Sequence, residues 1–160
     1  MGGSCGVSHG LLLTENGIIP FGSNEKSQLG LKVNEQDITK PIYSQDYKYL
    51  PIAGAKITKV ASGAYHNIAL SDKGSVYVWG HNKYGQLGLG DQATRSSPEL
   101  LKFPEFVEDI YCGEYHTVLL SKRRAFVFGS NKNGQLGIGK DIEIQLTPKS
   151  LKMPDGGKIM

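Results

Sequence analysis

Residues 63–70 read Gly63-Ala-Tyr-His66-Asn-Ile-Ala-Leu70, and this stretch decides the fold because it returns along the chain. The step from His66 to His116 is 50 residues, and the second copy reads Gly113-Glu-Tyr-His116-Thr-Val-Leu-Leu120. A fainter copy, Gly6-Val-Ser-His9-Gly-Leu-Leu-Leu13, lies 57 residues before His66. Self-similarity with a period of roughly 20 to 50 residues is typical of repeat architectures such as solenoids and propellers.

Each copy continues in the same way, first with an apolar segment that ends in an aromatic residue and a glycine, then with a loop that ends in Gln-Leu-Gly. The segments are Ile18–Gly22, Val76–Gly80 and Phe126–Gly129, and the loops close at Gly30, Gly88 and Gly137. The step between the two glycines is 8 residues in all three copies. A proline follows each loop, at positions 41, 98 and 148, and is expected to open an edge strand.

Side-chain alternation within a repeat predicts strands. His66, Ile68 and Leu70 would share one face of an extended segment, and the polar turn 71–74 would join this segment to 76–80 as a hairpin. Residues 57–61 and 107–112 supply further extended stretches. We therefore predict an all-β fold of antiparallel four-stranded blades of a β-propeller, without helices. The blades would be residues 1–56, with a loop insertion, residues 57–105 and residues 106–160.

These motifs resemble the regulator of chromosome condensation repeat, whose pattern is a G-x-x-H strand, a strand ending in W-G and an N-x-x-G-Q-L-G-x-G loop. Residues 61–90 match it almost throughout, whereas Phe128 and Phe21 replace Trp79 in the other copies, Pro20 interrupts a strand and Ser27 replaces the loop glycine. The resemblance implies a closed ring of about seven blades, so that three blades form a partial ring or a fragment. Members of this family exchange nucleotide on a small GTPase, bind chromatin, sense light or serve as interaction modules, so the fold does not select one function.

The composition of the chain limits the kinds of partner and the compartment that we expect. The 18 basic and 15 acidic residues give a net charge of only +3 and are spread along the chain, which argues against nucleic acid or a membrane as the partner. The two cysteines, Cys5 and Cys112, are expected to be buried residues of inner strands without a disulfide, which favours a reducing compartment. The longest early apolar run, 11–13, is too short for a signal peptide or a membrane span. An intracellular location, cytoplasmic or nuclear, follows.

The histidines invite a metal or catalytic interpretation, but their recurrence once per blade favours a structural role. The residues assigned to blade construction are His9, His66, His116, Gly63, Gly113, Trp79, Gly80, Gly85, Gly88, Gly134 and Gly137. Residues 88–93 fit a dinucleotide fingerprint, yet this fingerprint needs a following helix, and Gly137 and Gly139 repeat its spacing. We therefore predict no metal, no cofactor, no catalytic residue and no enzyme activity.

Partner contacts are expected where the repeat is irregular. Pro41 and Ile57 are 16 residues apart, whereas the equivalent step from Pro98 to Val107 is 9, so the first connection carries seven extra residues. They include Tyr47, Lys48 and Tyr49, and tyrosine beside charge is typical of binding hot spots. The alternative is a loop folded over its own blade. Tyr84 and the loop around Arg95 are the further candidates.

Two functions fit these features. The first is a non-catalytic protein-protein interaction module, and the alternative is a guanine-nucleotide exchange factor that acts on a small GTPase through a protruding loop. The expected partner is thus another protein. Self-association through uncovered terminal blades is a further hypothesis, because residues 158–160 resemble the start of an inner strand and residues 4–6 resemble its continuation.

Overall fold

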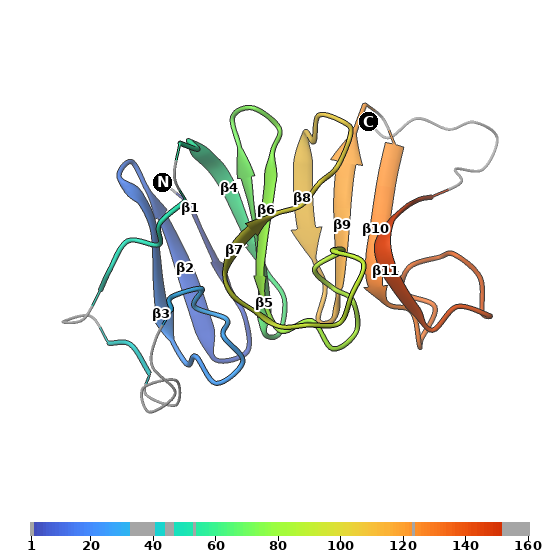
Figure 1. The fold of residues 1–160 in the computed structure, drawn as a ribbon, viewed down its shortest axis with the longest axis horizontal. Helices are drawn as coiled ribbons and strands as arrows, with labels where there is room; N and C mark the ends of the chain where they lie inside the picture. The colour runs from blue at the N-terminus through green and yellow to red at the C-terminus, as the bar shows by residue number, and fades with distance from the viewer. Residues whose placement is uncertain (1, 33–40, 44–46, 53, 123, 152–160) are drawn as a thin grey trace.

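The computed structural model describes residues 2–32, 41–43, 47–52, 54–122 and 124–151, and within them it contains strands β1 to β11 and no helix. The strands form three antiparallel sheets that stand side by side in chain order (Figure 1). Among the residues described there is consequently no helix that could span a membrane. The all-β propeller-blade fold predicted from the repeat is confirmed. Residues 158–160, on which the self-association hypothesis drew, lie outside the described part of the chain.

Each sheet is one blade. Blade one contains β1 (Gly2–Cys5), β2 (His9–Thr14) and β3 (Gly17–Gly22). Blade two contains β4 (Ile57–Ser62), β5 (His66–Ser71), β6 (Val76–Gly80) and β7 (Arg95–Leu100). Blade three contains β8 (Asp109–Cys112), β9 (His116–Ser121), β10 (Arg124–Ser130) and β11 (Ile144–Ser150).

The apolar core lies between the blades. One cluster fills the junction of blades one and two, and a larger cluster fills the junction of blades two and three. Both faces of β5 are buried because the strand has a blade on either side: Ala69 belongs to the first cluster, and Ile68 and Leu70 belong to the second. Stacking therefore buries apolar residues that a single blade would leave in water.

Blade one departs from the predicted four strands. Within the described residues it has three strands, and two isolated bridges, Ile18 with Leu50 and Gly22 with Ile42, stand in place of the outer strand. Pro20 gives the physical reason. It occupies, two residues before the strand glycine, the place at which Val78 pairs with Glu99 in blade two. Because proline has no N–H, it cannot complete this pair.

The prediction that the prolines after the loops open edge strands is wrong, and the places of these prolines differ between blades. Pro98 and Pro148 lie inside β7 and β11, at the interruption in register with β6 and β10. A bulge tolerates proline because it leaves residues out of the ladder. Pro41 instead precedes the first bridged residue of blade one. Part of the insertion therefore lies in the outer edge of blade one and not solely in its connection to blade two.

Candidate functional site

The outer edge of blade one carries three exposed aromatic side chains. Tyr43, Tyr47 and Tyr49 are 60%, 41% and 49% exposed, and Lys48 beside them is exposed as well. The two bridges fix both ends of this segment against β3, since Ile42 exchanges hydrogen bonds with Gly22, and the Leu50 N–H donates to the Ile18 oxygen at 2.8 Å. The predicted candidates Tyr47, Lys48 and Tyr49 thus lie together on one surface.

Two of these tyrosines also touch their own blade. The ring of Tyr47 is tilted against Phe21 with 6.2 Å between centroids. Tyr49 lies beside the turn at Gly17, where an added Cβ would be 3.5 Å from the Tyr49 ring. Each ring therefore keeps about half of its surface in water while its direction is partly set by the blade. Such partly ordered tyrosines offer large contact area at small entropic cost on binding.

An open cavity of about 690 Å³ adjoins the Tyr49 ring, between the β2–β3 hairpin and the connection to β4. Its lining includes Glu15, Tyr49, Pro51, Ile52 and Lys56. It therefore combines apolar surface with one acidic and one basic side chain at the edge of the array.

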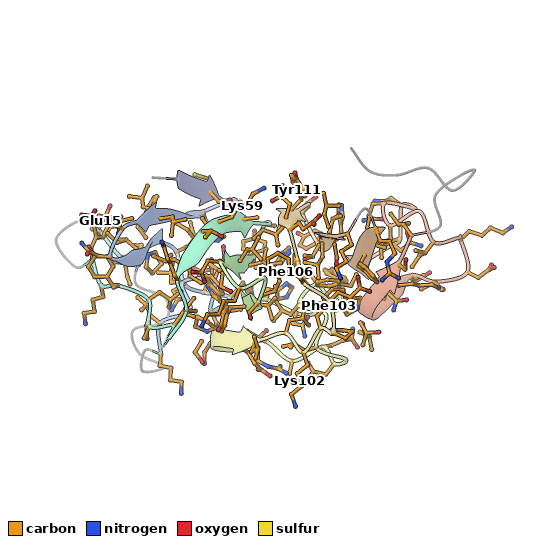
Figure 2. All side chains as sticks on the ribbon, turned by 90° about the horizontal axis from the view of Figure 1, so that it is seen from above. Glu15, Lys59, Lys102, Phe103, Phe106 and Tyr111 are labelled. Atoms are coloured by element: carbon orange, nitrogen blue, oxygen red, sulfur yellow. The ribbon has the colours of Figure 1, made fainter. Side chains whose placement is uncertain are left out.

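The corresponding place in blade two holds a cavity of only about 300 Å³. There Phe106 covers Gly74, and Phe103 packs edge-on against Phe126 at 4.9 Å between ring centroids. Figure 2 shows Phe103 and Phe106 near the middle of the array and Glu15 at its far end. Two phenylalanine rings thus line the smaller cavity, whereas in the larger cavity the Tyr49 ring lies beside the equivalent glycine, Gly17.

Tyr84 belongs to a second aromatic surface. Tyr65, His81, Tyr84 and Tyr115 form a row across blades two and three, with successive ring centroids 6.3, 6.2 and 5.0 Å apart. Sequence analysis selected only Tyr84 of this row. Tyr65 and Tyr115 precede the repeat histidines and could have been found as a pair of equivalent tyrosines on adjacent blades.

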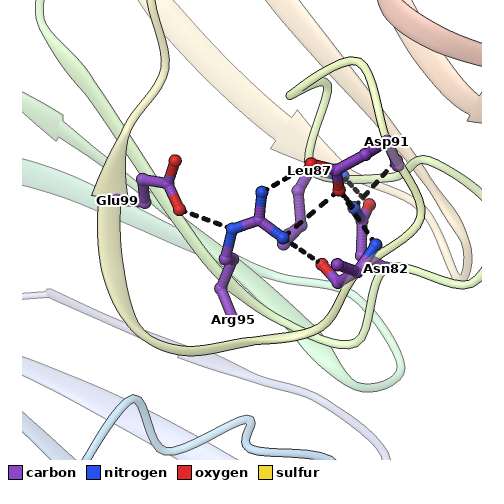
Figure 3. A network of polar contacts seen from close by, with 6 residues as sticks. Asn82, Leu87, Asp91, Arg95 and Glu99 are labelled. Carbon is purple, nitrogen blue, oxygen red and sulfur yellow. Dashed lines mark hydrogen bonds and ion pairs between the residues drawn. The ribbon is translucent and has the colours of Figure 1, made fainter.

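Arg95 is held by its own blade. Its guanidinium contacts the carboxylates of Asp91 and Glu99 and donates to the Ala93 oxygen at 2.6 Å (Figure 3). The Asn82 amide donates to Asp91, so Arg95 ties β7 to the preceding loop. The hydrogen bond from Arg95 lowers the pKa of Asp91 below its usual value. With its donors engaged in this way, Arg95 is better suited to shaping the loop than to meeting a partner.

The repeat histidines form the blade junctions. His9 Nε2 lies 2.8 Å from Asn67 Oδ1, the Asn67 amide donates to the Gln28 oxygen at 2.6 Å, and Trp79 Nε1 donates to the same oxygen. Because an amide oxygen only accepts, the proton of His9 must be on Nε2. A histidine and a loop carbonyl of blade one are thus bridged by a polar side chain of blade two.

The second junction repeats this arrangement. His66 Nε2 lies 3.1 Å from Thr117 Oγ1, and that hydroxyl donates to the Gln86 oxygen at 2.8 Å. Burial lowers the pKa of His66 to about 3, so the ring is neutral at physiological pH. Desolvation likewise lowers the pKa of His9 and, at the half-buried position of blade three, that of His116. These contacts support the structural role expected for the histidines.

Glycines at the junctions allow histidine and aromatic rings to pack directly against the backbone. A Cβ on Gly63 would lie 2.1 Å from the His66 ring, and one on Gly88 would lie 2.8 Å from the Phe128 ring of the next blade. Gly113 lies under the His116 ring as Gly63 lies under that of His66. The remaining assigned glycines share the positive φ of Gly88; they are Gly80, Gly85, Gly134 and Gly137. Ser27 takes the left-handed conformation, φ 59°, at the place of the missing loop glycine.

The cysteines differ from expectation in part. Both are free, but Cys5 is exposed, whereas the equivalent Cys112 packs against the core cluster of blades two and three. Burial raises the pKa of Cys112 to about 12, so its thiol is inert. In the described residues no three His, Cys, Asp or Glu side chains gather in a way that could hold a metal ion.

Comparisons with known sequences agree with the repeat. The family model described as the Regulator of chromosome condensation (RCC1) repeat matches residues 18–70, 73–120 and 124–160, and a second model of this repeat matches residues 57–86. The probable E3 ubiquitin-protein ligase HERC4 of Mus musculus is 36% identical over 122 residues, which cover 74% of this chain and 11% of that protein. The ultraviolet-B receptor UVR8 of Arabidopsis thaliana is 37% identical over 152 residues, which cover 93% of this chain and 33% of the receptor.

Two solved structures share the blade arrangement. Human WBSCR16 superposes with a TM-score of 0.88 at 29% identity, over 100% of this chain and 41% of that structure. Prp20p of Saccharomyces cerevisiae, whose structure is described with its binding properties to Gsp1p and histones, superposes with a TM-score of 0.80 over 95% of this chain and 38% of its own. At 21% identity this second likeness shows the fold alone.

Antiparallel blades that are joined by a histidine, a polar side chain and a loop carbonyl define a β-propeller repeat protein. The chain belongs to the regulator of chromosome condensation repeat family. It spans about a tenth of the length of HERC4 and about a third of that of UVR8.

Proposed function

We propose that the chain is a non-catalytic protein-protein interaction module and that the outer edge of blade one contacts the partner. The observation that carries this proposal is the exposure of Tyr43, Tyr47 and Tyr49 on the outer edge of blade one, where Tyr49 also lines an open cavity of about 690 Å³. Rigid aromatic anchors next to a pocket are typical of the centre of a protein interface. The lining of the cavity suits a partner that inserts an apolar side chain there.

The repeat histidines and Arg95 serve the scaffold better than a partner. Buried histidines at blade junctions have no access to a substrate, and Arg95 is held by two carboxylates. This distribution supports a protein that acts by binding and not by chemistry. Two cysteines without a disulfide suit a reducing compartment, so we place this activity inside the cell.

Site-specific photo-crosslinking tests the proposal. A photoreactive phenylalanine analogue replaces Tyr47 in one variant and Tyr111 in a matched variant, because Tyr111 is also about half exposed but lies on inner strand β8. After irradiation in cells, we expect one protein to be linked to position 47 and to be missing at position 111. Equal linkage at both positions, or linkage at 111 alone, would contradict a partner contact at the outer edge.

Guanine-nucleotide exchange on a small GTPase is the alternative function. Its support is the membership of the family together with the likeness to Prp20p, whose described binding includes Gsp1p. The protein identified by crosslinking decides between the two. If it is a small GTPase whose nucleotide release this chain accelerates, the exchange function is correct. If it is any other protein, or a GTPase whose nucleotide release stays unchanged, the interaction module stands.

A further inference from the structure

The second aromatic row, which consists of Tyr65, His81, Tyr84 and Tyr115, lies at one end of blades two and three. Tyr65 and Tyr115 belong to the turns that lead into β5 and β9, and the other two residues belong to the loop that follows β6, at the bottom of the array in Figure 1. All four side chains are partly exposed. Each ring therefore has a packed side and a side that a ligand can reach.

Hydrogen bonds of the loop hold this row in place. The Tyr84 N–H donates to Gln86 Oε1 at 2.9 Å, and the Gln86 amide donates to His81 Nδ1 at 3.2 Å. The His81 N–H donates to the Tyr65 carbonyl at 2.9 Å, and the Gln86 side chain is buried. Because these contacts already order the rings, a ligand that binds them has little conformational entropy to offset.

Edges and faces of rings alternate along the row. Successive rings make interplanar angles of 85°, 80° and 59°, and their centroids are 6.3, 6.2 and 5.0 Å apart. Edge-to-face packing of this kind covers part of each ring face, whereas a planar base stacks on an open face. The row is therefore better suited to a small non-planar apolar ring than to a nucleic-acid base.

The polar groups of the row are mainly hydrogen-bond donors. Burial, together with the charges of Lys26 and Lys83, lowers the pKa of His81, so the ring is neutral at physiological pH. Since Nδ1 accepts the Gln86 amide, the ring proton is on Nε2, and the tyrosine hydroxyls are further donors. Lys83 Nζ lies 5.8 Å from the centre of the Tyr84 ring. A matching ligand thus offers carbonyl acceptors, apolar rings and an acidic group near the two lysines.

We propose that the second aromatic row is a separate binding site that takes a proline-rich segment of another protein in the polyproline II conformation, with an acidic residue next to Lys26 and Lys83. A polyproline II segment rises about 3.1 Å per residue and leaves its backbone carbonyls without internal partners, so each step along the row spans about two of its residues. The proline rings pack on the aromatic edges and faces, and the carbonyls accept from the tyrosine hydroxyls and His81 Nε2. This site and its ligand are independent of the outer edge of blade one.

Peptide binding to the full chain tests the proposal. The probe is a fluorescent peptide, Asp-Pro-Pro-Leu-Pro-Pro-Gly, and its matched control replaces every proline by alanine. In anisotropy titrations we expect the proline peptide to bind about tenfold more tightly, because only it is ordered as polyproline II before binding. Equal affinities, or no binding of either peptide, would overturn the proposal. Tighter binding of a fluorescent oligothymidylate than of the proline peptide would show that single-stranded nucleic acid is the occupant.

A matched pair of tyrosine variants locates the site. Tyr84→Ala should weaken the proline peptide about tenfold, as expected for an aromatic anchor, whereas Tyr47→Ala on blade one should leave its affinity unchanged. An equal loss in both variants, or a loss with Tyr47→Ala alone, would overturn the location. The peptide titration and the crosslink at position 47 have different readouts, so either site can be refuted without the other.

A third variant applies if Tyr84→Ala does not fold. Lys26 is exposed, and only its backbone N–H takes part in the loop, where it donates to Gln28 Oε1 at 2.7 Å. Lys26→Glu should therefore preserve the fold, weaken the proline peptide about threefold and leave a peptide with Asn in place of Asp unchanged. Unchanged binding of the Asp peptide, or equal weakening of both peptides, would contradict the proposed acidic contact.

Discussion

Blade one and blade two have the same inner architecture and different outer edges. In blade two, Val78 pairs with Glu99, and the outer strand β7 runs from Arg95 to Leu100. In blade one, Pro20 removes the equivalent pair, and the outer edge is reduced to the bridges at Ile42 and Leu50. The difference shows how one residue without an N–H releases a segment from the sheet and allows it to carry exposed tyrosines.

The inner halves of the blades are constrained by contacts that reach across the junctions. At the two junctions, His9 and His66 each contact a polar side chain of the next blade, and Gly30 and Gly88 each lie under an aromatic ring of the next blade. A change at these positions alters two blades at once. On the outer edge, the Tyr47 ring instead rests on Phe21 of its own blade, and we expect it to tolerate change without disturbing the array.

The largest effect is expected from acidification, because it acts on the buried junction histidine. Below about pH 6.5 the unfolded chain binds a proton at His66, whereas the folded chain stays neutral until about pH 3, so stability is lost as the pH falls through this window. His66→Gln keeps a donor for Thr117 but cannot titrate. Between about pH 6.5 and pH 4 we expect wild-type protein to lose as much as about 3 kcal/mol more than this variant in denaturant unfolding.

The control for this pH experiment is the half-buried histidine of blade three. His116→Gln should remove less of the pH dependence than His66→Gln, because the pKa of His116 is lowered by a smaller burial. If His66→Gln unfolded with the same pH dependence as the wild type, the buried neutral histidine could not be a junction element.

A matched pair of glycines measures the junction in a different way. Gly88 and Gly137 are equivalent residues with φ of 71° and 65°, and only Gly88 lies under a ring of the next blade. Substitution by alanine adds a similar left-handed strain of about 1–2 kcal/mol at both sites. Gly88→Ala should cost roughly 1–3 kcal/mol more than Gly137→Ala, because its Cβ also meets Phe128. Denaturant midpoints at neutral pH provide the measurement, and equal midpoints would contradict the inferred packing.

The repeat made much of this structure predictable. The spacing of His66 and His116 and the period-two alternation predicted the strands, and the recurrence of the histidines predicted a structural role that their contacts support. Side-chain partners across a junction were not predictable. Asn67 and Gln28 are 39 residues apart, and nothing in their sequence or strand position distinguishes them from other polar residues. Pro20 marked blade one as irregular in the sequence, but the loss of the outer strand could not be predicted from it. A proline weakens pairing only with the strand that its missing N–H would face, and the sequence does not give that side of β3.

The candidate site was only partly predictable. The length of the insertion selected Tyr47 and Tyr49, but their exposure depends on how the segment lies over Phe21 and the hairpin at Gly17. Cys5 illustrates the same limit: its repeat position suggested burial, and it is exposed because burial at that position requires a neighbouring blade. The repeat predicts the structural position of a residue, and the neighbouring segments determine whether the residue is buried or exposed there.

The outer edge of blade one is the central claim, and a double variant tests it most directly against the protein that crosslinks at position 47. Tyr47→Ala with Tyr49→Ala should weaken binding of the purified partner by about 2 kcal/mol or more, while the free energy of unfolding changes by no more than about 0.5 kcal/mol. Tyr84→Ala, in the second aromatic row, serves as the control and should leave affinity unchanged. A large loss of stability with unchanged affinity per folded molecule would contradict the account and direct the search to the row of Tyr65, Tyr84 and Tyr115.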